Sequence, residues 1–161
     1  AVLNQTGKEY RLKEALADLD SFDFVVMDTP PSLNIITINA LTASDYAVIP
    51  AQADIFSLQG ITQLGQTIEA VKRYTNEDLK VLGIVLTKHN TRSILSRDLQ
   101  KVITDTAMQL HTKVYTQHIR EAVAVREAQA MKQDVFSYDP KSNATQDYDA
   151  LMNEIWKDIN Q

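Results

Sequence analysis

The apolar residues of the chain fall into short unbroken runs separated by longer amphipathic stretches. The first run, residues 24–27 (Phe-Val-Val-Met), is followed by Asp28 and then by Pro30 and Pro31. Such a run is typical of a strand that is covered on both faces in a parallel sheet. Because proline donates no main-chain hydrogen bond, the two prolines end the ladder. The pattern predicts a buried strand with Asp28 at its carboxyl end.

Further strands and helices follow from the same periodicities. Short apolar runs predict strands at residues 45–50, 79–87 and 113–116, and an extended piece at 135–138. Apolar side chains three and four residues apart predict helices at 10–19, 33–43, 57–74, 93–110 and 143–160, and residues 120–132 read as a loop passing into a helix. Ser57 is the expected cap of its helix. Trp156 shares the apolar pattern of the last helix, which predicts a core position.

The order of these elements predicts the fold class. With 161 residues, 44% of them hydrophobic and 23% charged, the chain is in the range of one globular domain, residues 1–161. Strands that alternate with helices of ten or more residues imply crossover connections. The sequence therefore predicts an α/β fold, with a mainly parallel sheet and helices on both faces.

Composition excludes several kinds of site. The chain has no cysteine, so it has neither disulfides nor thiolate metal sites. Its histidines, at positions 89, 111 and 118, lack the spacing of a histidine zinc site. No apolar run approaches the roughly 18–20 residues of a membrane span, and we expect a cytoplasmic protein. The net charge of -5 leaves only a local basic stripe for binding nucleic acid.

Asp28 is the first candidate for chemistry. In open α/β sheets ligands bind beyond the carboxyl ends of the strands, so a carboxylate there is a candidate for holding a metal ion or its water. An alternative is that Asp28 caps the helix that follows.

Several segments together resemble a known family. They lie, in order, at residues 22–32, 37–45, 85–92, 123–128 and 138–142. Their order and spacing are similar to those of the ParA/MinD-type partition ATPases, a family of deviant P-loop NTPases. In this resemblance residues 22–32 correspond to the Walker B strand and the switch segment.

The resemblance also shows what the chain lacks. Family members open with a glycine-rich loop whose lysines wrap the nucleotide phosphates. The glycines here, Gly7, Gly60, Gly65 and Gly83, are not closely spaced. We therefore expect a carboxyl-terminal portion with an incomplete P-loop NTPase-like fold. ATP and Mg²⁺, the cofactors of the family, are expected to bind it weakly or not at all, and efficient ATP hydrolysis is not expected.

The resemblance implies roles for particular residues. Asp28 would hold the magnesium ion through water. The switch segment would comprise Thr29, Pro30, Pro31 and Ser32. The pocket for the nucleotide base would comprise Lys88, Asn90, Ile119, Arg120 and Glu121. Asn90 offers both a donor and an acceptor to an adenine edge, although it equally suits a helix cap.

Basic residues suggest a DNA-binding surface in the same family framework. The candidates for contacts with nonspecific DNA are Arg92, Arg97, Lys101 and Arg126. Asp98 and Asp105 interrupt this stripe, and solvated side chains are the alternative. The loop at residues 119–126 departs from the family pattern. Arg120 occupies the position where family members usually have proline, and Ala124 occupies the position where they usually have arginine.

Two functions of different classes follow. The first is a part of an ATP-dependent ATPase that partitions DNA in plasmid or chromosome segregation, with nonspecific DNA and a centromere-binding protein as partners and a homodimer as a further expectation. The second is a catalytically inactive module that pairs with a full-length ATPase or a partner protein. A metabolic α/β enzyme has only the architecture in its favour.

Overall fold

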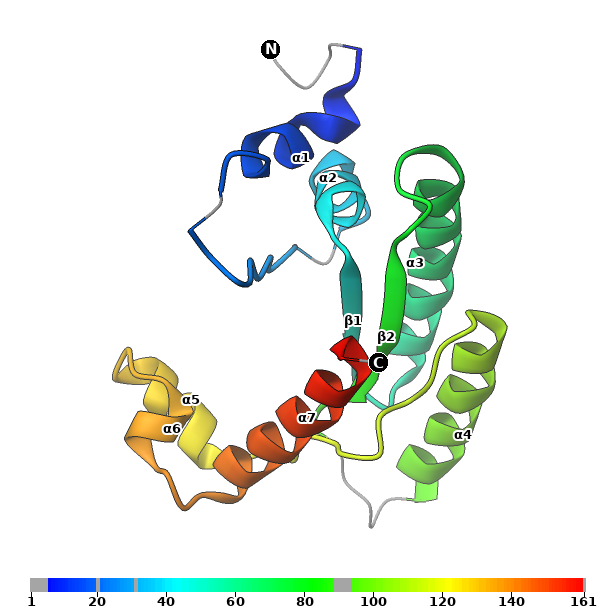
Figure 1. The fold of residues 1–161 in the computed structure, drawn as a ribbon. Coiled ribbons are helices and arrows are strands. Elements are labelled where there is room, and N and C mark those ends of the chain that lie inside the picture. Colours follow the sequence, from blue (N-terminus) through cyan, green and yellow to red (C-terminus); the bar gives the residue numbers. More distant parts are fainter. Residues whose placement is uncertain (1–5, 20, 31, 89–93, 161) are drawn as a thin grey trace. The chain divides into compact units, whose positions relative to one another are not determined.

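The computed structural model describes residues 6–19, 21–30, 32–88 and 94–160, without the side chains of residues 94–97. The chain divides into two compact units, which are described separately. The first comprises Ala1–Ala47 and Thr62–Lys80, and the second comprises Val48–Ile61 and Val81–Gln161. Figure 1 shows the helices and strands of both.

A strand–helix–strand unit forms the sheet. Strand β1 (Tyr46–Ala51) is followed by helix α3 (Ile55–Tyr74) and strand β2 (Lys80–Leu86) (Figure 1). The Lys80 N–H donates to Asp45 O at 3.0 Å, and the Thr87 N–H donates to Ala51 O at 2.8 Å. Because the pairing advances in the same direction along both strands, β1 and β2 are parallel. The predicted α/β class is confirmed, although β1 and β2 are the only named strands in the described ranges.

The segment at residues 113–119 extends the sheet beyond β2. Parallel bridges join Val114 to Ile84 and Ile119 to Thr87. The Ile84 N–H donates to Lys113 O at 2.8 Å, and the Ile119 N–H donates to Leu86 O at 2.8 Å. The short strand predicted at 113–116 therefore pairs with β2 at isolated bridges, without forming a longer ladder.

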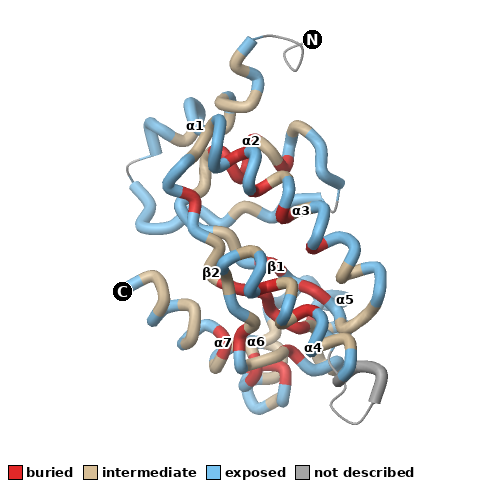
Figure 2. The backbone as a smooth tube through the Cα atoms, turned by 90° about the vertical axis from the view of Figure 1, so that its right-hand side faces the viewer, coloured by how far each residue is buried: buried red, intermediate tan, exposed pale blue. Residues whose placement is uncertain are grey.

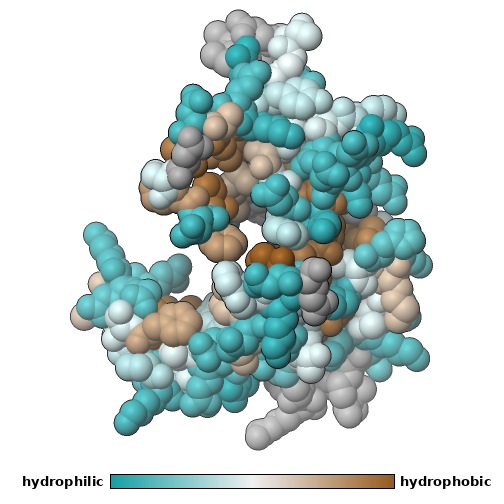
Figure 3. Space-filling view, in the orientation of Figure 1, coloured by the Kyte–Doolittle hydropathy of each residue, from teal (hydrophilic) through white to brown (hydrophobic). Residues whose placement is uncertain are grey.

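The apolar run at residues 24–27 is not a strand. Residues 21–30 contain no regular element, and Phe24 and Val26 are 56% and 93% exposed. A strand exists only where a neighbour accepts and donates its main-chain hydrogen bonds, and no described strand pairs with this run. The predicted buried strand is wrong for this structure, and the apolar side chains along this segment lie at the surface (Figure 3).

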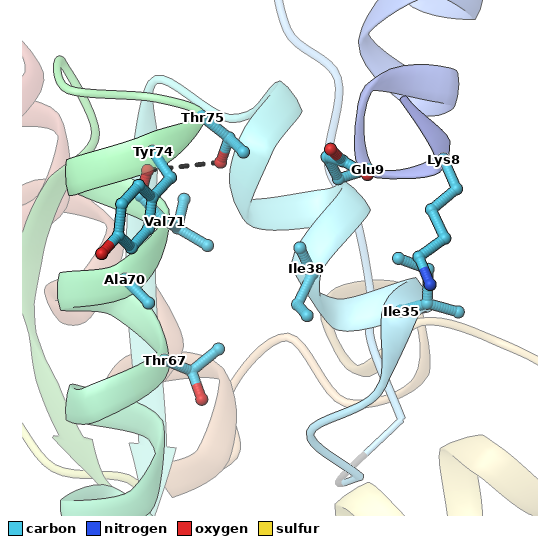
Figure 4. Close-up of a pocket in the computed structure, with 9 residues that line it drawn as sticks. All are labelled: Lys8, Glu9, Ile35, Ile38, Thr67, Ala70, Val71, Tyr74 and Thr75. Carbon is cyan, nitrogen blue, oxygen red and sulfur yellow. Dashed lines mark hydrogen bonds between the residues drawn. The ribbon is translucent and has the colours of Figure 1, made fainter. Parts of the chain in front are cut away.

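The first unit also contains three short helical elements. They are η2 (Lys8–Tyr10), α1 (Arg11–Leu16) and α2 (Ile35–Ala43). Buried Asn39 ties them together, because its Oδ1 accepts from the Leu12 N–H at 3.1 Å and its Nδ2 donates to Lys8 O at 2.8 Å. A cavity of about 240 Å³ lies in this unit, with Ile38 of α2 on one side and Val71 of α3 on the other (Figure 4).

The second unit is built around β2. Its core comprises Val85, Tyr115, Ile119 and Leu151, with Tyr148 and Ile155 among the side chains packed against it. Its helices are α4 (Ile94–Gln109), α5 (Val123–Ala130), α6 (Val135–Tyr138) and α7 (Asn143–Ile159). The last four residues of β2 are buried, and the buried residues of α7 lie in its first nine positions; Figure 2 colours buried residues red.

Three local predictions are corrected. Helix α3 is capped by Asp54, whose Oδ1 accepts from the Ser57 N–H at 2.7 Å, and not by Ser57. The piece predicted to be extended at 135–138 is a helical turn, because Asp134 Oδ1 accepts from the Ser137 N–H at 2.9 Å. Trp156 is 52% exposed, since it lies about 100° around the helix from Ile155.

Candidate functional site

A pocket of about 330 Å³ opens at the carboxyl end of β2, beside the end of the segment 113–119. Its lining residues are Thr87, Lys88, Ile119, Arg120, Glu121, Ala122, Val125, Arg126, Gln129 and Tyr148. Small-molecule pockets usually measure about 300–1,000 Å³ and lie beyond the carboxyl ends of parallel strands. Both the volume and the position fit a small ligand.

The main chain around this pocket is held from two sides. The Ile119 N–H donates to Leu86 O; beyond Ile119 the chain leaves the sheet, and α5 begins at Val123. Residues 119–122 therefore form one wall. At the end of β2, Lys88 has a φ of 49°, in the left-handed region that a lysine rarely adopts. Such strained positions cluster at functional sites, and Lys88 lines the pocket.

Asp147 of α7 forms hydrogen bonds with Arg120 in the wall. Its carboxylate accepts from the Arg120 main-chain N–H at 3.0 Å, from Arg120 Nε at 2.9 Å and from Nη2 at 2.7 Å. Gln117 Nε2 adds a bond at 3.2 Å. Burial of the carboxyl group would raise its pKa, but the hydrogen bonds and charge of Arg120, with the charge of His118, lower the pKa. Asp147 is thus a buried, ionised and paired carboxylate.

Two more carboxylates of α7 hold the same segment. Glu154 accepts from the main-chain N–H groups of Thr116 at 3.2 Å and Gln117 at 3.0 Å. Asp158 pairs with Lys113 Nζ at 2.7 Å and accepts from the Tyr115 hydroxyl at 2.8 Å. The bond from Lys113 lowers the pKa of Asp158, and burial together with Asp158 raises the pKa of Tyr115 well above its usual value. Asp147, Glu154 and Asp158 are separated by seven and then four residues, so all three carboxylates lie on the same side of α7.

The pocket brings together most of the residues predicted to bind a nucleotide base. Lys88, Ile119, Arg120 and Glu121 all line it, together with Arg126, which was predicted to bind DNA. Asn90 lies outside the described residues. Sequence reasoning did not select Asp147 or Tyr148 as site residues. The only signal for them was their position just after the Tyr138–Ser142 stretch quoted in the family resemblance.

The predicted magnesium and switch residues belong to the first unit. Asp28, Thr29, Pro30 and Ser32 are exposed, and Pro31 lies outside the described residues. Thr37 Oγ1 donates to Ser32 O at 2.7 Å, and Asn34 Nδ2 donates to Ser32 Oγ at 2.9 Å. No group of three or more His, Asp or Glu side chains is placed to hold a metal ion within the described ranges. The roles of these residues remain predictions.

The predicted DNA-binding residues are described only in part. Lys101 of α4 and Arg126 of α5 are exposed. Arg92 and the side chain of Arg97 lie outside the described part of the chain. Within that part, no helix is both long and apolar enough to span a bilayer.

Comparisons with known proteins give the family. A family model described as an AAA domain matches residues 1–81, half of the chain. The chromosome partitioning protein ParA of Caulobacter vibrioides is 38% identical over 157 residues, which are 95% of this chain and 58% of that protein. The sporulation initiation inhibitor protein Soj of Bacillus subtilis is 38% identical over 92% of this chain and 58% of its own length.

A solved structure agrees over almost the whole chain. The cobyrinic acid a,c-diamide synthase of Mycobacterium smegmatis is 35% identical, with a TM-score of 0.73, over 97% of this chain and 57% of that one. The same protein with bound ADP and magnesium matches at 42% identity and a TM-score of 0.60, over 65% of this chain and 43% of that one. The fold of the chain is therefore the α/β fold of this solved structure. The chain belongs to the ParA-type partition ATPases of the AAA-domain family, and it spans less than two thirds of the length of these relatives.

Proposed function

We propose that this chain is the Walker B to carboxyl-terminal part of an ATPase that partitions DNA in plasmid or chromosome segregation. The observation that carries the proposal is the pocket at the end of β2, because predicted base-binding residues from distant parts of the sequence line it together. The names of two relatives support the partitioning role, because one is the chromosome partitioning protein ParA of Caulobacter vibrioides and the other is the chromosome-partitioning ATPase Soj of Treponema pallidum.

The pocket lining fits the base of a nucleotide. Ile119, Ala122 and Val125 supply apolar walls, and Lys88 and Arg126 supply positive charge. At this wall the Glu121 N–H is a donor for a base edge and the carbonyl oxygens are acceptors, since the Ile119 and Arg120 N–H groups donate to Leu86 O and Asp147. Binding of ADP and magnesium by the synthase of Mycobacterium smegmatis supports the same cofactors here. In this proposal Asp28 holds the magnesium ion through water, and residues 29–32 respond to the terminal phosphate.

The 161-residue chain by itself is proposed to hydrolyse ATP poorly. Phosphoryl transfer depends on a loop that cradles the β- and γ-phosphates and on a metal ion that bridges them. The sequence has no run of closely spaced glycines that would form such a loop. We therefore propose weak nucleotide and magnesium binding by the chain alone, and hydrolysis only in the full-length protein that carries it, in the cytoplasm.

Filling the pocket tests the proposed base site. In the full-length protein, Ala122→Trp is expected to raise the Kd of a fluorescent ATP analogue about 10-fold, because the indole occupies the space of the base. The matched control is Ala130→Trp, on the exposed end of α5 and outside the pocket lining. Fluorescence titration gives both constants. Equal affinity of the Ala122→Trp variant and the unmodified protein would place the base elsewhere.

A salt titration tests the proposed DNA contact. Replacing Arg92 with Ala in the full-length protein is expected to weaken binding to DNA of any sequence. The slope of the logarithm of the binding constant against the logarithm of the salt concentration is expected to become shallower by about one, because one phosphate contact is lost. Gel-shift titrations at two salt concentrations measure both effects. Lys157→Ala, an exposed basic residue outside the predicted stripe, is the control. Unchanged affinity and slope would remove Arg92 from the interface.

The second candidate is an inactive module that pairs with a full-length ATPase or a partner protein. The exposed apolar run at residues 24–26 favours it, because such a run suits pairing with another chain. Sequencing the DNA upstream of Ala1 separates the two. An in-frame loop rich in glycine and lysine supports the ATPase, and a stop codon followed by a separate start site supports the module.

A further inference from the structure

Asp147 is a charged residue in the interior of the second unit, and the binding of a base does not by itself require it. The residue is 4% exposed, although it stands on the helix α7 that packs against the core. Among the described residues, the hydrogen bonds that its carboxylate accepts come from Gln117 and Arg120. An isolated buried charge is costly, so Asp147 is stable there only while these partners surround it.

The contacts of Asp147 fix the pocket wall in both side chain and main chain. Arg120 presents Nε and Nη2 to the two carboxylate oxygens in a fork, which sets the direction of the guanidinium as well as its distance. The bond from the Arg120 N–H fixes the peptide between Ile119 and Arg120. That peptide belongs to the wall that lines the pocket.

The same contacts decide which charges face a ligand. Arg120 directs its guanidinium to Asp147 and, through Nη2, to Asn143 O at 3.4 Å, so its positive charge is balanced by a partner on α7. The Ile119 N–H donates to Leu86 O and the Arg120 N–H donates to Asp147, so the Glu121 N–H and the carbonyl oxygens are left as the polar main-chain part of this wall. A base edge is read by the positions of such groups, and a shift of about 1 Å is enough to lose the match.

We propose that Asp147 is a positioning residue that sets the base preference of the pocket by holding the main chain at residues 119–121. The inference rests on the proposed function, because it requires a nucleotide base in this pocket. A carboxylate on α7 acts through Arg120 and need not touch the ligand. Without the hydrogen bonds from Arg120 to Asp147, the main chain at residues 119–121 can move. The pocket then discriminates less between adenine and guanine.

The test compares two nucleotides in the full-length protein. The Asp147→Asn variant is expected to bind a fluorescent ATP analogue about 10-fold more weakly, while its affinity for the matching GTP analogue falls much less. The Kd of the GTP analogue divided by the Kd of the ATP analogue therefore falls. A purely structural role would weaken both to the same degree. Amide hydrogen exchange at Arg120 is expected to become faster, because Asp147 holds that N–H directly.

The controls separate the failure of this inference from the failure of the proposed function. Asp149→Asn, an exposed change two residues along the same helix, is expected to leave both Kd values unchanged. If the unmodified protein binds neither analogue, the proposed function fails. If it prefers one analogue and Asp147→Asn keeps that preference, the inference is overturned. Should Asp147→Asn not fold, Arg120→Lys carries the test, since lysine cannot form the fork; an unchanged Kd ratio in that variant also overturns the inference.

Discussion

Replacing Gly83 with Ala is expected to destabilise the protein by about 3 kcal/mol, the upper end of the usual cost of overpacking a core. A Cβ atom at position 83 of β2 would lie 2.5 Å from Tyr115 Cε2 and 2.8 Å from Cδ2. The ring cannot move aside easily. Tyr115 is 3% exposed, and its hydroxyl donates to Asp158 at 2.8 Å. Urea denaturation, followed by circular dichroism, measures the change in the free energy of unfolding.

Gly60 provides the matched control for this prediction. A Cβ atom there would have no neighbour within 4 Å, and the residue lies inside helix α3. Gly60→Ala is expected to stabilise the protein by about 0.5–1 kcal/mol, because alanine is the better helix former. In a Tyr115→Leu background the Gly83→Ala change is expected to cost much less, as a contact between the two positions requires. An equal cost in both backgrounds would contradict the proposed clash.

The elements that sequence periodicity predicted well are those whose neighbours lie nearby in the chain. Strands β1 and β2 and the long helices α3, α4 and α7 lie within a few residues of their predicted positions. The run at 24–27 has a stronger strand pattern than β1, yet it forms no strand. An apolar pattern shows that the side chains of a segment suit a sheet. A strand also needs main-chain hydrogen bonds, which neighbouring strands supply. Local periodicity contains no information about those neighbours.

The candidate site shows a similar division. Lys88 and the wall at residues 119–121 were predicted from family resemblance, and the structure places them around one pocket. Asp147 was not predicted, because an aspartate in an amphipathic helix normally faces water. Its partner Arg120 lies 27 residues earlier in the chain. A pairing over that separation depends on the fold, and no spacing rule identifies it.

Replacing Asp28 with Ala in the full-length protein is expected to lower magnesium-dependent ATP hydrolysis at least about 100-fold. Magnesium binds through one or two carboxylates together with phosphate oxygens and water, so few protein groups share the role of Asp28. A bound metal ion supplies several kcal/mol of stabilisation to a phosphoryl transition state, and a 100-fold loss of rate corresponds to about 2.7 kcal/mol. Phosphate release during a magnesium titration measures the effect.

Asp23 is the control for this last prediction, because it is an exposed carboxylate five residues earlier in the same irregular segment. Asp23→Ala is expected to leave hydrolysis unchanged, which would exclude a general effect of negative charge near the switch. The 161-residue chain is expected to hydrolyse little ATP with or without the Asp28 change. If the chain alone hydrolysed ATP as fast as an intact partition ATPase, and kept that rate after Asp28→Ala, then neither Asp28 nor a separate phosphate loop would be required, and the proposed division of the catalytic site would be wrong.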